Sequence, residues 1–501
     1  MCISTLRILY PVHDAPAKEV LKEFFRLIGC LCCEEPMRSA DEAEERLLEN
    51  SGLDVDIVLN LNVFHWESLF TSGQDPALPI RMNRVKLTDR EKLITVIKCE
   101  LPGDGEPGTD GRRPKEAFYQ ELLETLIRTI WNQETSFERD QLLEIRRIFF
   151  EQHLLGYLQC RRALEVVNMG EALEISPKSK EDGSKAEKIQ PLPYIGKMLS
   201  GFNKLYQALD LRCSGEVEGE ISVYVRYARI NIARKIREIV SLLDTIPEAV
   251  EDNGDFSSIT YCSANYLLSE LGTLYQEDPN YLGTLFLAAH VCQSEPSQEL
   301  SAAFYYQQLF DRIGEKNQRT YAFLYYEYGR YTEKIRGKWD SAILYYTKAK
   351  ELNPLSCRAY FKLACHEARI RNFNAARGLF RKVIQIIGEV FSGASGPEEI
   401  RWENLSLRSI QYVFKAYVWL WKIALAVDDY GEAVIYLNQA RIIIEKYRKN
   451  ILLERIYDQD SDAWTALAKY HIESRPVQLL REIVEKGYRT ITEDFPADEQ
   501  S

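Results

Sequence analysis

Long apolar runs are missing from this sequence. A helix needs about 20 consecutive apolar residues to cross a bilayer, and no such run is present. A secretory leader is missing as well, because Met1 to Arg7 is followed by only a short apolar run, Ile8 to Tyr10. We therefore expect a cytoplasmic protein without a membrane partner.

Positive charge is in short supply. The 63 Lys and Arg residues are outnumbered by 75 Asp and Glu residues, which gives a net charge of −12. A protein that binds nucleic acid neutralises phosphates with a surplus of cations on one face. The composition therefore argues against nucleic acid as a partner, although a local basic groove is compatible with it.

The residue types that hold metals and cofactors do not stand in suitable patterns. The six histidines form no HExxH or HxxxH pair, and no phosphate loop of the form GxxxxGKS or GxxxxGKT occurs. Cys30, Cys32 and Cys33 lack the CxxC spacing of a zinc or redox site. We interpret them as reduced thiols packed as small hydrophobic residues, and we expect neither a metal nor a cofactor.

The start of the chain alternates between strand and helix patterns. Apolar, β-branched runs predict strands at 6–12, 31–33, 54–62 and 92–99, the second of them at a sheet edge. Amphipathic patterns predict helices at 15–29, 39–49 and 114–132, with a short helix between the last two strands. Such alternation favours a small parallel sheet with helices on both faces.

Beyond about residue 120 the strand pattern ends and long amphipathic helices follow. We expect three parts: a small α/β domain at 1–135, a helical linker domain at 136–250 and a helical repeat array at 251–501. The predicted fold class is α+α/β, an N-terminal small parallel α/β sandwich followed by an all-α superhelix.

One triplet of residue types recurs in the last third of the chain. The second copy follows the first after about 34 residues, the length of one helical-hairpin repeat, and the third follows after one more such period and an insertion that includes 392–399. The three copies are Ala342, Tyr346 and Ala349, then Ala376, Phe380 and Val383, then Ala433, Leu437 and Ala440. A weaker fourth copy lies at 281–310. This spacing predicts stacked helical hairpins, since one hairpin alone cannot bury its apolar face.

The helices that precede these triplets repeat as well. They carry an aromatic residue, then an apolar or aromatic one, and then in two of the three copies a small residue: Tyr325, Tyr328 and Gly329, then Tyr360, Leu363 and Ala364, then Tyr417, Leu420 and Trp421. Pro354 stands between the first two repeats, where a helix must break. The whole pattern resembles the tetratricopeptide-repeat (TPR) family.

The resemblance implies a binding surface. In the TPR family the first helix of each hairpin lines a concave groove, and the register carries this role to Tyr326, Arg330, Arg358, Phe361, Lys415 and Lys422. Cations beside aromatic rings suit an acidic peptide or protein with an apolar anchor. The alternative is that these residues form solvated helix faces. The Lys and Asn carboxylate clamp of the family is not matched here.

The segment 1–135 resembles Toll/interleukin-receptor-type (TIR-like) or other flavodoxin-like domains. The resemblance lies in the strand that leads into His13 and Asp14, in the strand 56–60, and in Trp66 followed by Glu67. It implies that Glu67 is the catalytic carboxylate of an NAD-hydrolysing domain, with His13 and Asp14 at the C-terminal edge of the sheet. The alternative is a surface Glu67 in a structural or signalling domain.

Two functions follow from these patterns. The first is an adaptor or sensor that binds a protein or peptide through the helical array. The second is an effector enzyme whose N-terminal domain hydrolyses NAD under control of the array. Either function is compatible with an oligomer.

Overall fold

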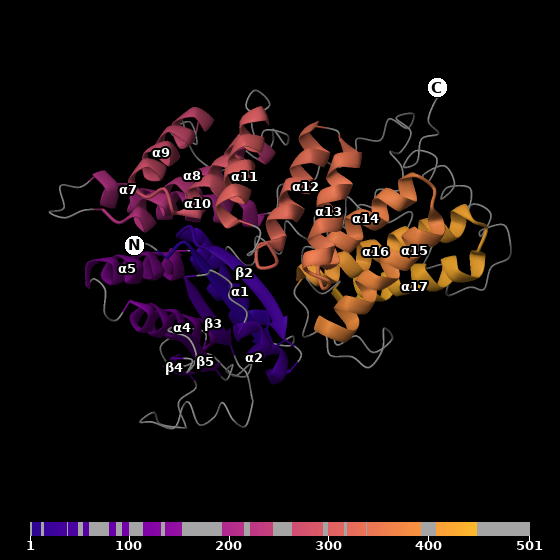
Figure 1. The fold of residues 1–501 in the computed structure, drawn as a ribbon, viewed down its shortest axis with the longest axis horizontal. Helices are drawn as coiled ribbons and strands as arrows, with labels where there is room; N and C mark the ends of the chain where they lie inside the picture. The colour runs from indigo at the N-terminus through magenta and orange to yellow at the C-terminus, as the bar shows by residue number, and fades with distance from the viewer. Residues whose placement is uncertain are drawn as a thin grey trace. The chain divides into compact units, whose positions relative to one another are not determined.

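The structure is a computed structural model of the chain (Figure 1). It describes residues 3–11, 15–37, 39–48, 54–59, 80–86, 93–99, 114–131, 136–152, 193–214, 221–243, 263–293, 299–314, 318–336, 338–391 and 407–447. Contacts divide the chain into two compact units. Unit 1 comprises Met1–Leu158, Pro193–Leu324 and Lys334–Arg336, and unit 2 comprises Gln159–Leu192, Tyr325–Glu333 and Gly337–Ser501.

Unit 1 contains a five-stranded mixed sheet. Its strands lie in the order β2-β1-β3-β5-β4 and comprise β1 (Thr5–Pro11), β2 (Leu31–Met37), β3 (Val55–Leu59), β4 (Ile80–Lys86) and β5 (Leu93–Cys99). Strands β2, β1, β3 and β5 pair in parallel, as the alternation of strands and helices predicts. The four expected strands are present, and β2 lies at an edge.

The fifth strand, β4, corrects the prediction of a wholly parallel sheet, because it pairs antiparallel with β5. Only six residues separate β4 from β5, and a parallel crossover needs a dozen or more. Sequence patterns missed β4 because the alternation that begins with Ile80 and Met82 breaks at Arg84, where the next apolar residue would be expected. The short helix expected before β5 falls on residues outside the described part of the chain.

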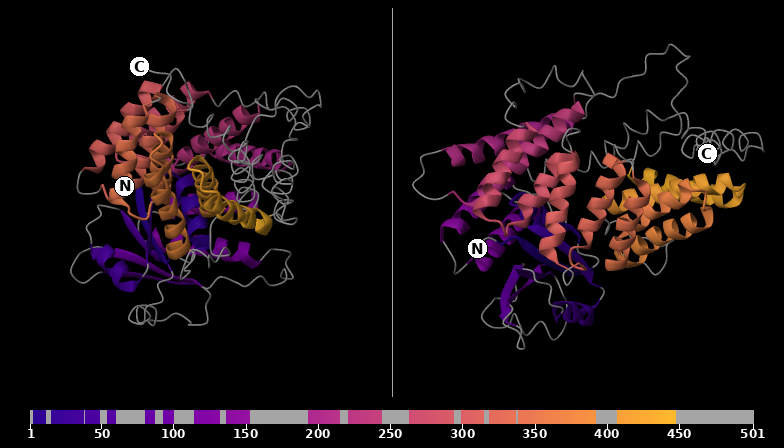
Figure 2. Two further views of the ribbon diagram at one scale, coloured as in Figure 1. Left: turned by 90° about the vertical axis from the view of Figure 1, so that its right-hand side faces the viewer. Right: turned by 45° about the horizontal axis from the view of Figure 1, so that its top comes forward.

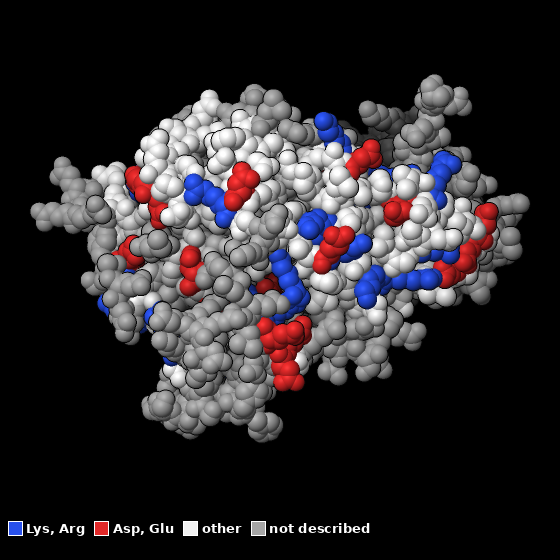
Figure 3. Space-filling view, in the orientation of Figure 1, with Lys and Arg blue, Asp and Glu red and all other residues white. Residues whose placement is uncertain are grey.

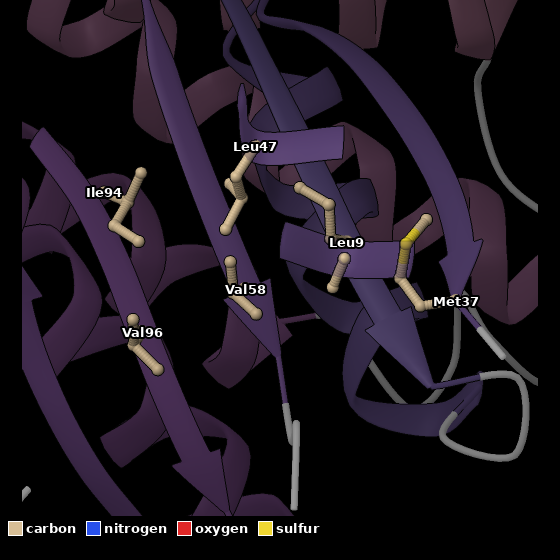
Figure 4. Close-up of a cluster of buried hydrophobic side chains, with 7 residues drawn as sticks. Leu9, Met37, Leu47, Val58, Ile94 and Val96 are labelled. Atoms are coloured by element: carbon tan, nitrogen blue, oxygen red, sulfur yellow. The ribbon is translucent and has the colours of Figure 1, made fainter. Parts of the chain in front are cut away.

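Helices cover both faces of the sheet. Helix α2 (Ala40–Leu48) lies over one face, where Leu47 packs with Leu9, Val58 and Ile94 of three different strands (Figure 4). Side chains alternate along a strand, so the neighbours of Leu9 point to the other face. Two further helices pack against the sheet, α1 (Ala15–Leu27) on β2 and α4 (Pro114–Ile130) on β4, and α5 (Ser136–Gln152) packs on α4.

A buried ion pair joins two central strands. Arg7 of β1 and Asp56 of β3 are paired in register, and their side chains are 1% and 0% exposed. The Arg7 Nε donates to Asp56 Oδ1 at 3.0 Å, Nη2 donates to Oδ2 at 3.3 Å, and Nη1 donates to the Arg46 carbonyl of α2 at 3.0 Å. Because a buried charge without its counter-ion is costly, the pair strongly favours this register of β1 and β3.

The sheet and the following helices belong to the same unit. These helices are α7 (Pro193–Ser214), α8 (Val223–Leu243), α9 (Ala264–Glu277), α10 (Leu282–Gln293) and α11 (Glu299–Ile313). The turn after α1 is left-handed at Gly29, with φ of 95°, and it inserts between α8 and α10. A Cβ on Gly283 of α10 would lie 2.0 Å from the Gly29 carbonyl oxygen, so the two backbones are in direct contact.

Tyrosine and asparagine side chains complete this contact. The Tyr281 hydroxyl donates to the Ile28 carbonyl, and Asn231 Nδ2 donates to the Arg26 carbonyl at 3.2 Å. The Tyr224 hydroxyl accepts from the Ile3 amide at 2.6 Å. The sheet and helices α8 and α10 are thus fastened by long-range hydrogen bonds. The predicted boundaries at residues 135 and 250 stay a prediction.

Unit 2 is helical. Its elements are α12 (Ala322–Arg336), most of which lies in this unit, α13 (Trp339–Leu352), α14 (Cys357–Arg369), α15 (Phe373–Gln385), the π-helix η6 (Ile386–Phe391), α16 (Leu407–Ala426) and α17 (Tyr430–Tyr447). From α13 to α17, each helix packs against the next one along the chain (Figures 1 and 2). No helix in the described part of the chain is both long and apolar enough to span a membrane.

Candidate functional site

The repeated residues occupy equivalent buried positions on the second helices α13, α15 and α17. All but one of the nine are at most 3% exposed, and Leu437 is partly buried. The buried ones are Ala342, Tyr346, Ala349, Ala376, Phe380, Val383, Ala433 and Ala440. The period of the sequence therefore corresponds to a repeated packing surface in the structure.

The turns between helices repeat as well. Arg371 after α14 and Asp428 after α16 occupy equivalent places in two repeats, and both are left-handed, with φ of 60° and 58°. In each turn the next amide bonds back five residues at 2.8 Å, from Asn372 to the Glu367 carbonyl and from Asp429 to the Ala424 carbonyl. This is the Schellman arrangement that ends many helices. The repeat is thus present in the main chain as well as in the side chains.

Close packing within a hairpin explains the small residue on the first helix. A Cβ on Gly329 of α12 would lie 2.7 Å from the Tyr346 ring of α13. At the equivalent place on α14, Ala364 is fully buried. Trp421 of α16, which departs from the small-residue pattern, is also buried, at 4% exposed. The third hairpin therefore accommodates a large side chain where the other two need a small one.

Four of the six predicted groove residues come together around one carboxylate and one tyrosine. Arg330 Nη1 lies 3.0 Å from Glu327 Oε2, and Arg358 Nη1 lies 3.9 Å from Glu327 Oε1. The Arg358 guanidinium also lies over the Tyr326 ring, 5.8 Å from its centroid. The Glu327 carboxylate raises the pKa of the Arg330 guanidinium, so Arg330 stays charged.

Aromatic rings form the other side of this group. The Tyr326 and Tyr412 hydroxyl oxygens are 3.4 Å apart, which links α12 to α16. The Phe361 ring of α14 packs edge-on against Tyr412 at 5.3 Å and against Phe380 at 5.5 Å. We call Tyr326, Glu327, Arg330, Arg358, Phe361 and Tyr412 the arginine–tyrosine cluster.

The two remaining predicted groove residues have other neighbours. Lys422 is only 7% exposed, and its ammonium lies over the Trp419 ring at 5.3 Å. Lys415 lies close to Cys365. Burial raises the pKa of that thiol to about 12, although the nearby cations Lys362, Arg369 and Lys415 partly oppose the rise. The six residues thus do not form one strip of equal exposure.

The charge of this surface is more balanced than the sequence suggests. On the face shown in Figure 3, basic and acidic side chains lie beside one another over the helices of unit 2. In the predicted groove, Glu327 pairs with Arg330, and Glu333 pairs with Lys362 at 2.7 Å. Sequence reasoning missed Glu327, although its spacing of three residues from Arg330 signals an ion pair on a helix.

The candidate catalytic residues Glu67, His13 and Asp14 lie outside the described residues. The segments that follow the C-terminal ends of β1, β3 and β5 also fall outside them. In open parallel sheets ligands bind at this edge. Among the residues that the structure describes, no group of three His, Cys, Asp or Glu side chains is arranged to hold a metal ion.

The chain was also compared with known proteins. It matches no model of a protein family, and no curated protein matches it.

Proposed function

We propose that helices α12 to α17 are a tetratricopeptide-type array that binds a protein or peptide partner. The observation that supports this most directly is the agreement between sequence period and structure. The same residue types are buried on successive second helices, and the same left-handed turn follows two of the first helices. Arrays of this kind expose the residues of their first helices to ligands.

The arginine–tyrosine cluster is the part of the array best suited to contact a partner. It draws side chains from the three first helices α12, α14 and α16, through the contacts from Tyr326 to Tyr412 and from Phe361 to Tyr412. Arginine and tyrosine are the residue types that most often dominate binding energy at protein interfaces. The cluster contains both residue types, and its cations are partly accessible: 36% of the Arg330 side chain and 28% of the Arg358 side chain are exposed.

Selection of peptides with the full chain tests this proposal. We expect the purified protein to enrich a family of peptides from a displayed library, and the variant with Arg330→Gln and Arg358→Gln to lose them. Arg381→Gln is the matched control, because Arg381 lies on the second helix α15 with 53% of its side chain exposed. Retention of the same peptides by the double variant, or failure to enrich any peptide, would overturn the proposal.

A second candidate function concerns the sheet of unit 1, as a TIR-like or flavodoxin-like domain that hydrolyses NAD. The parallel order β2-β1-β3-β5 favours it, because the strand order reverses at β1 and β3 and such a reversal creates a ligand crevice. The antiparallel β4 departs from a wholly parallel fold. Release of nicotinamide by the full chain, and its loss in Glu67→Ala, would support the enzyme; no release from either would exclude it.

A further inference from the structure

The two arginines of the arginine–tyrosine cluster differ in how their donors are used. Arg330 donates a hydrogen bond to Glu327 at 3.0 Å. Arg358 has the same carboxylate at 3.9 Å, which is beyond hydrogen-bond distance, and no described residue accepts a hydrogen bond from its guanidinium. A guanidinium has five N–H donors in a planar fork. Among the described residues the Arg358 donors thus have no acceptor, and the side chain is only 28% exposed.

The position of Arg358 is nevertheless well defined. Its guanidinium lies over the Tyr326 ring, 5.8 Å from the centroid, and Tyr326 itself is 6% exposed. The ring attracts the cation and restricts where it can lie. A side chain held in this way loses little further freedom when it binds, which favours affinity.

The tyrosine hydroxyls add a further donor. Tyr326 and Tyr412 share one hydrogen bond of 3.4 Å, so one hydroxyl donates and the other keeps its own O–H for another acceptor. Burial raises the pKa of the Tyr326 hydroxyl well above its ordinary value, so this group keeps its proton. The acceptor that fits beside a guanidinium and a phenol is an anionic oxygen.

The charges limit what that anion can be. Arg330, Arg358 and Glu327 together carry one net positive charge. The Glu327 carboxylate is the ion-pair partner of Arg330. A dianionic phosphate or a run of acidic residues would meet the Glu327 carboxylate at close range. The partly buried Tyr412 ring, which packs against the buried Phe361 at 5.3 Å, is an apolar surface near the guanidinium.

We propose that Arg358, with the Tyr326 and Tyr412 hydroxyls beside it, binds one carboxylate of the partner, and that an apolar side chain next to this carboxylate contacts the Tyr412 ring. This inference rests on the proposed function of the array, and it specifies the chemistry of the partner. The carboxylate belongs either to an Asp or Glu side chain or to the end of a chain, because both offer the same two oxygens.

Synthetic peptides distinguish these sources. Peptides selected by the full chain are made with their acidic residue intact, with Gln or Asn in its place, and with phosphoserine in its place, each with a free and with an amidated C-terminus. We expect loss of the carboxylate to weaken binding about tenfold or more, since a hydrogen bond to a charged group is lost. Phosphoserine is expected to bind no better than the original residue. Sensitivity only to amidation would identify a terminal carboxylate.

Three variants assign the effect to this place. Arg358→Lys keeps the charge but loses the planar fork, so we expect weaker binding of the carboxylate peptides and unchanged binding of the Gln or Asn peptides. Glu327→Gln removes the competing anion, so we expect tighter binding and acceptance of phosphoserine. Arg381→Gln is the control and should bind as the wild type does. Circular dichroism of each variant checks that the helices are intact.

The outcomes separate this inference from the function on which it rests. Peptides that bind equally with Glu or Gln, or that bind the wild type and Arg358→Lys alike, overturn the carboxylate site and leave the array's binding function standing. If the wild type binds the phosphoserine peptide more tightly than the original peptide, the inference that the site accepts only a singly charged anion is overturned. If no peptide binds the full chain at all, the proposed function itself fails.

Discussion

The contacts that stabilise unit 1 internally differ in kind from those that stabilise unit 2. In unit 1, contacts join residues far apart in the chain: Arg7 to Asp56 in the sheet, and Gly29 to Gly283 between the sheet and a helix. In unit 2, the helices from α13 onward pack mainly on their neighbours along the chain. Stacked repeats of this kind have a stability that is close to a sum of local terms. A defect in unit 1 should therefore spread, whereas a defect in unit 2 should stay local.

The largest effect is expected at the backbone contact of unit 1. Gly283→Ala would place a methyl group 2.0 Å from the Gly29 carbonyl oxygen, and a backbone atom cannot rotate away. We expect a loss of about 4 kcal/mol or more, or failure to fold. Gly272→Ala is the control, because nothing lies within 4 Å of its added Cβ and Ala favours the helix α9. Equal melting temperatures for Gly283→Ala and the wild type would refute the contact.

The next largest effect is expected for the buried ion pair. Asp56→Ala leaves the Arg7 guanidinium buried without its partner, which should cost about 3–5 kcal/mol. The double variant Arg7→Met with Asp56→Leu removes both charges and should recover much of this loss. Urea unfolding of the three proteins measures the difference. A double variant that is no more stable than Asp56→Ala would show that the unpaired Arg7 charge is not the cause of the lost stability.

A smaller and more local effect is expected in unit 2. Gly329→Ala meets the Tyr346 ring at 2.7 Å, and a side chain can shift, so we expect a loss of about 1–3 kcal/mol. Hydrogen exchange read by mass spectrometry should show faster exchange in α12 and α13 and unchanged exchange in the sheet. Gly378→Ala on α15 has open space around it and serves as the control. Faster exchange across the sheet in Gly329→Ala would contradict the local character of unit 2.

The smallest effect is expected in thiol reactivity. Burial raises the pKa of both Cys32 in unit 1 and Cys365 in unit 2 to about 12. Since the thiolate is the reactive form, both should resist alkylation at pH 8 and react faster as the pH rises toward 12. At pH 8 reaction then needs opening of the structure, so we expect Cys365 to be labelled before Cys32. Peptide mapping over time measures the order in which the two thiols are labelled. Labelling of Cys32 before Cys365 would contradict the inference that unit 2 opens more readily than unit 1.

The sequence predicted local features well. The period of Ala342 and Ala376 was visible because the same buried contact recurs along the chain, and the parallel strands were visible because β3 and β5 are mostly apolar and β-branched. Strand β4 was missed, since its alternation of apolar and polar residues breaks at Arg84 after only two apolar positions.

Long-range features were out of reach of the sequence. Nothing in the sequence near Gly29 or Gly283 indicates that these two backbones, so distant along the chain, are in contact. Glycine also occurs in ordinary turns, so its presence does not by itself signal a close backbone contact. At the candidate site, the register of the repeat pointed to Tyr326, Arg330, Arg358 and Phe361. It could not reveal that the Glu327 carboxylate lies near both arginines. The side-chain contact that joins Tyr326 to Tyr412 depends on how three helices stack, which a linear pattern does not contain.

The matched turns after α14 and α16 bear on how such a protein can change over time. Arg371 and Asp428 are unlike in size and charge, yet both adopt a left-handed angle that glycine would accept without strain. The hydrogen bonds of the turn, rather than the chemistry of its side chain, therefore determine the angle. Residues of unlike chemistry can therefore hold these two places as long as they tolerate a left-handed angle, so the turns can persist while the amino acids in them change.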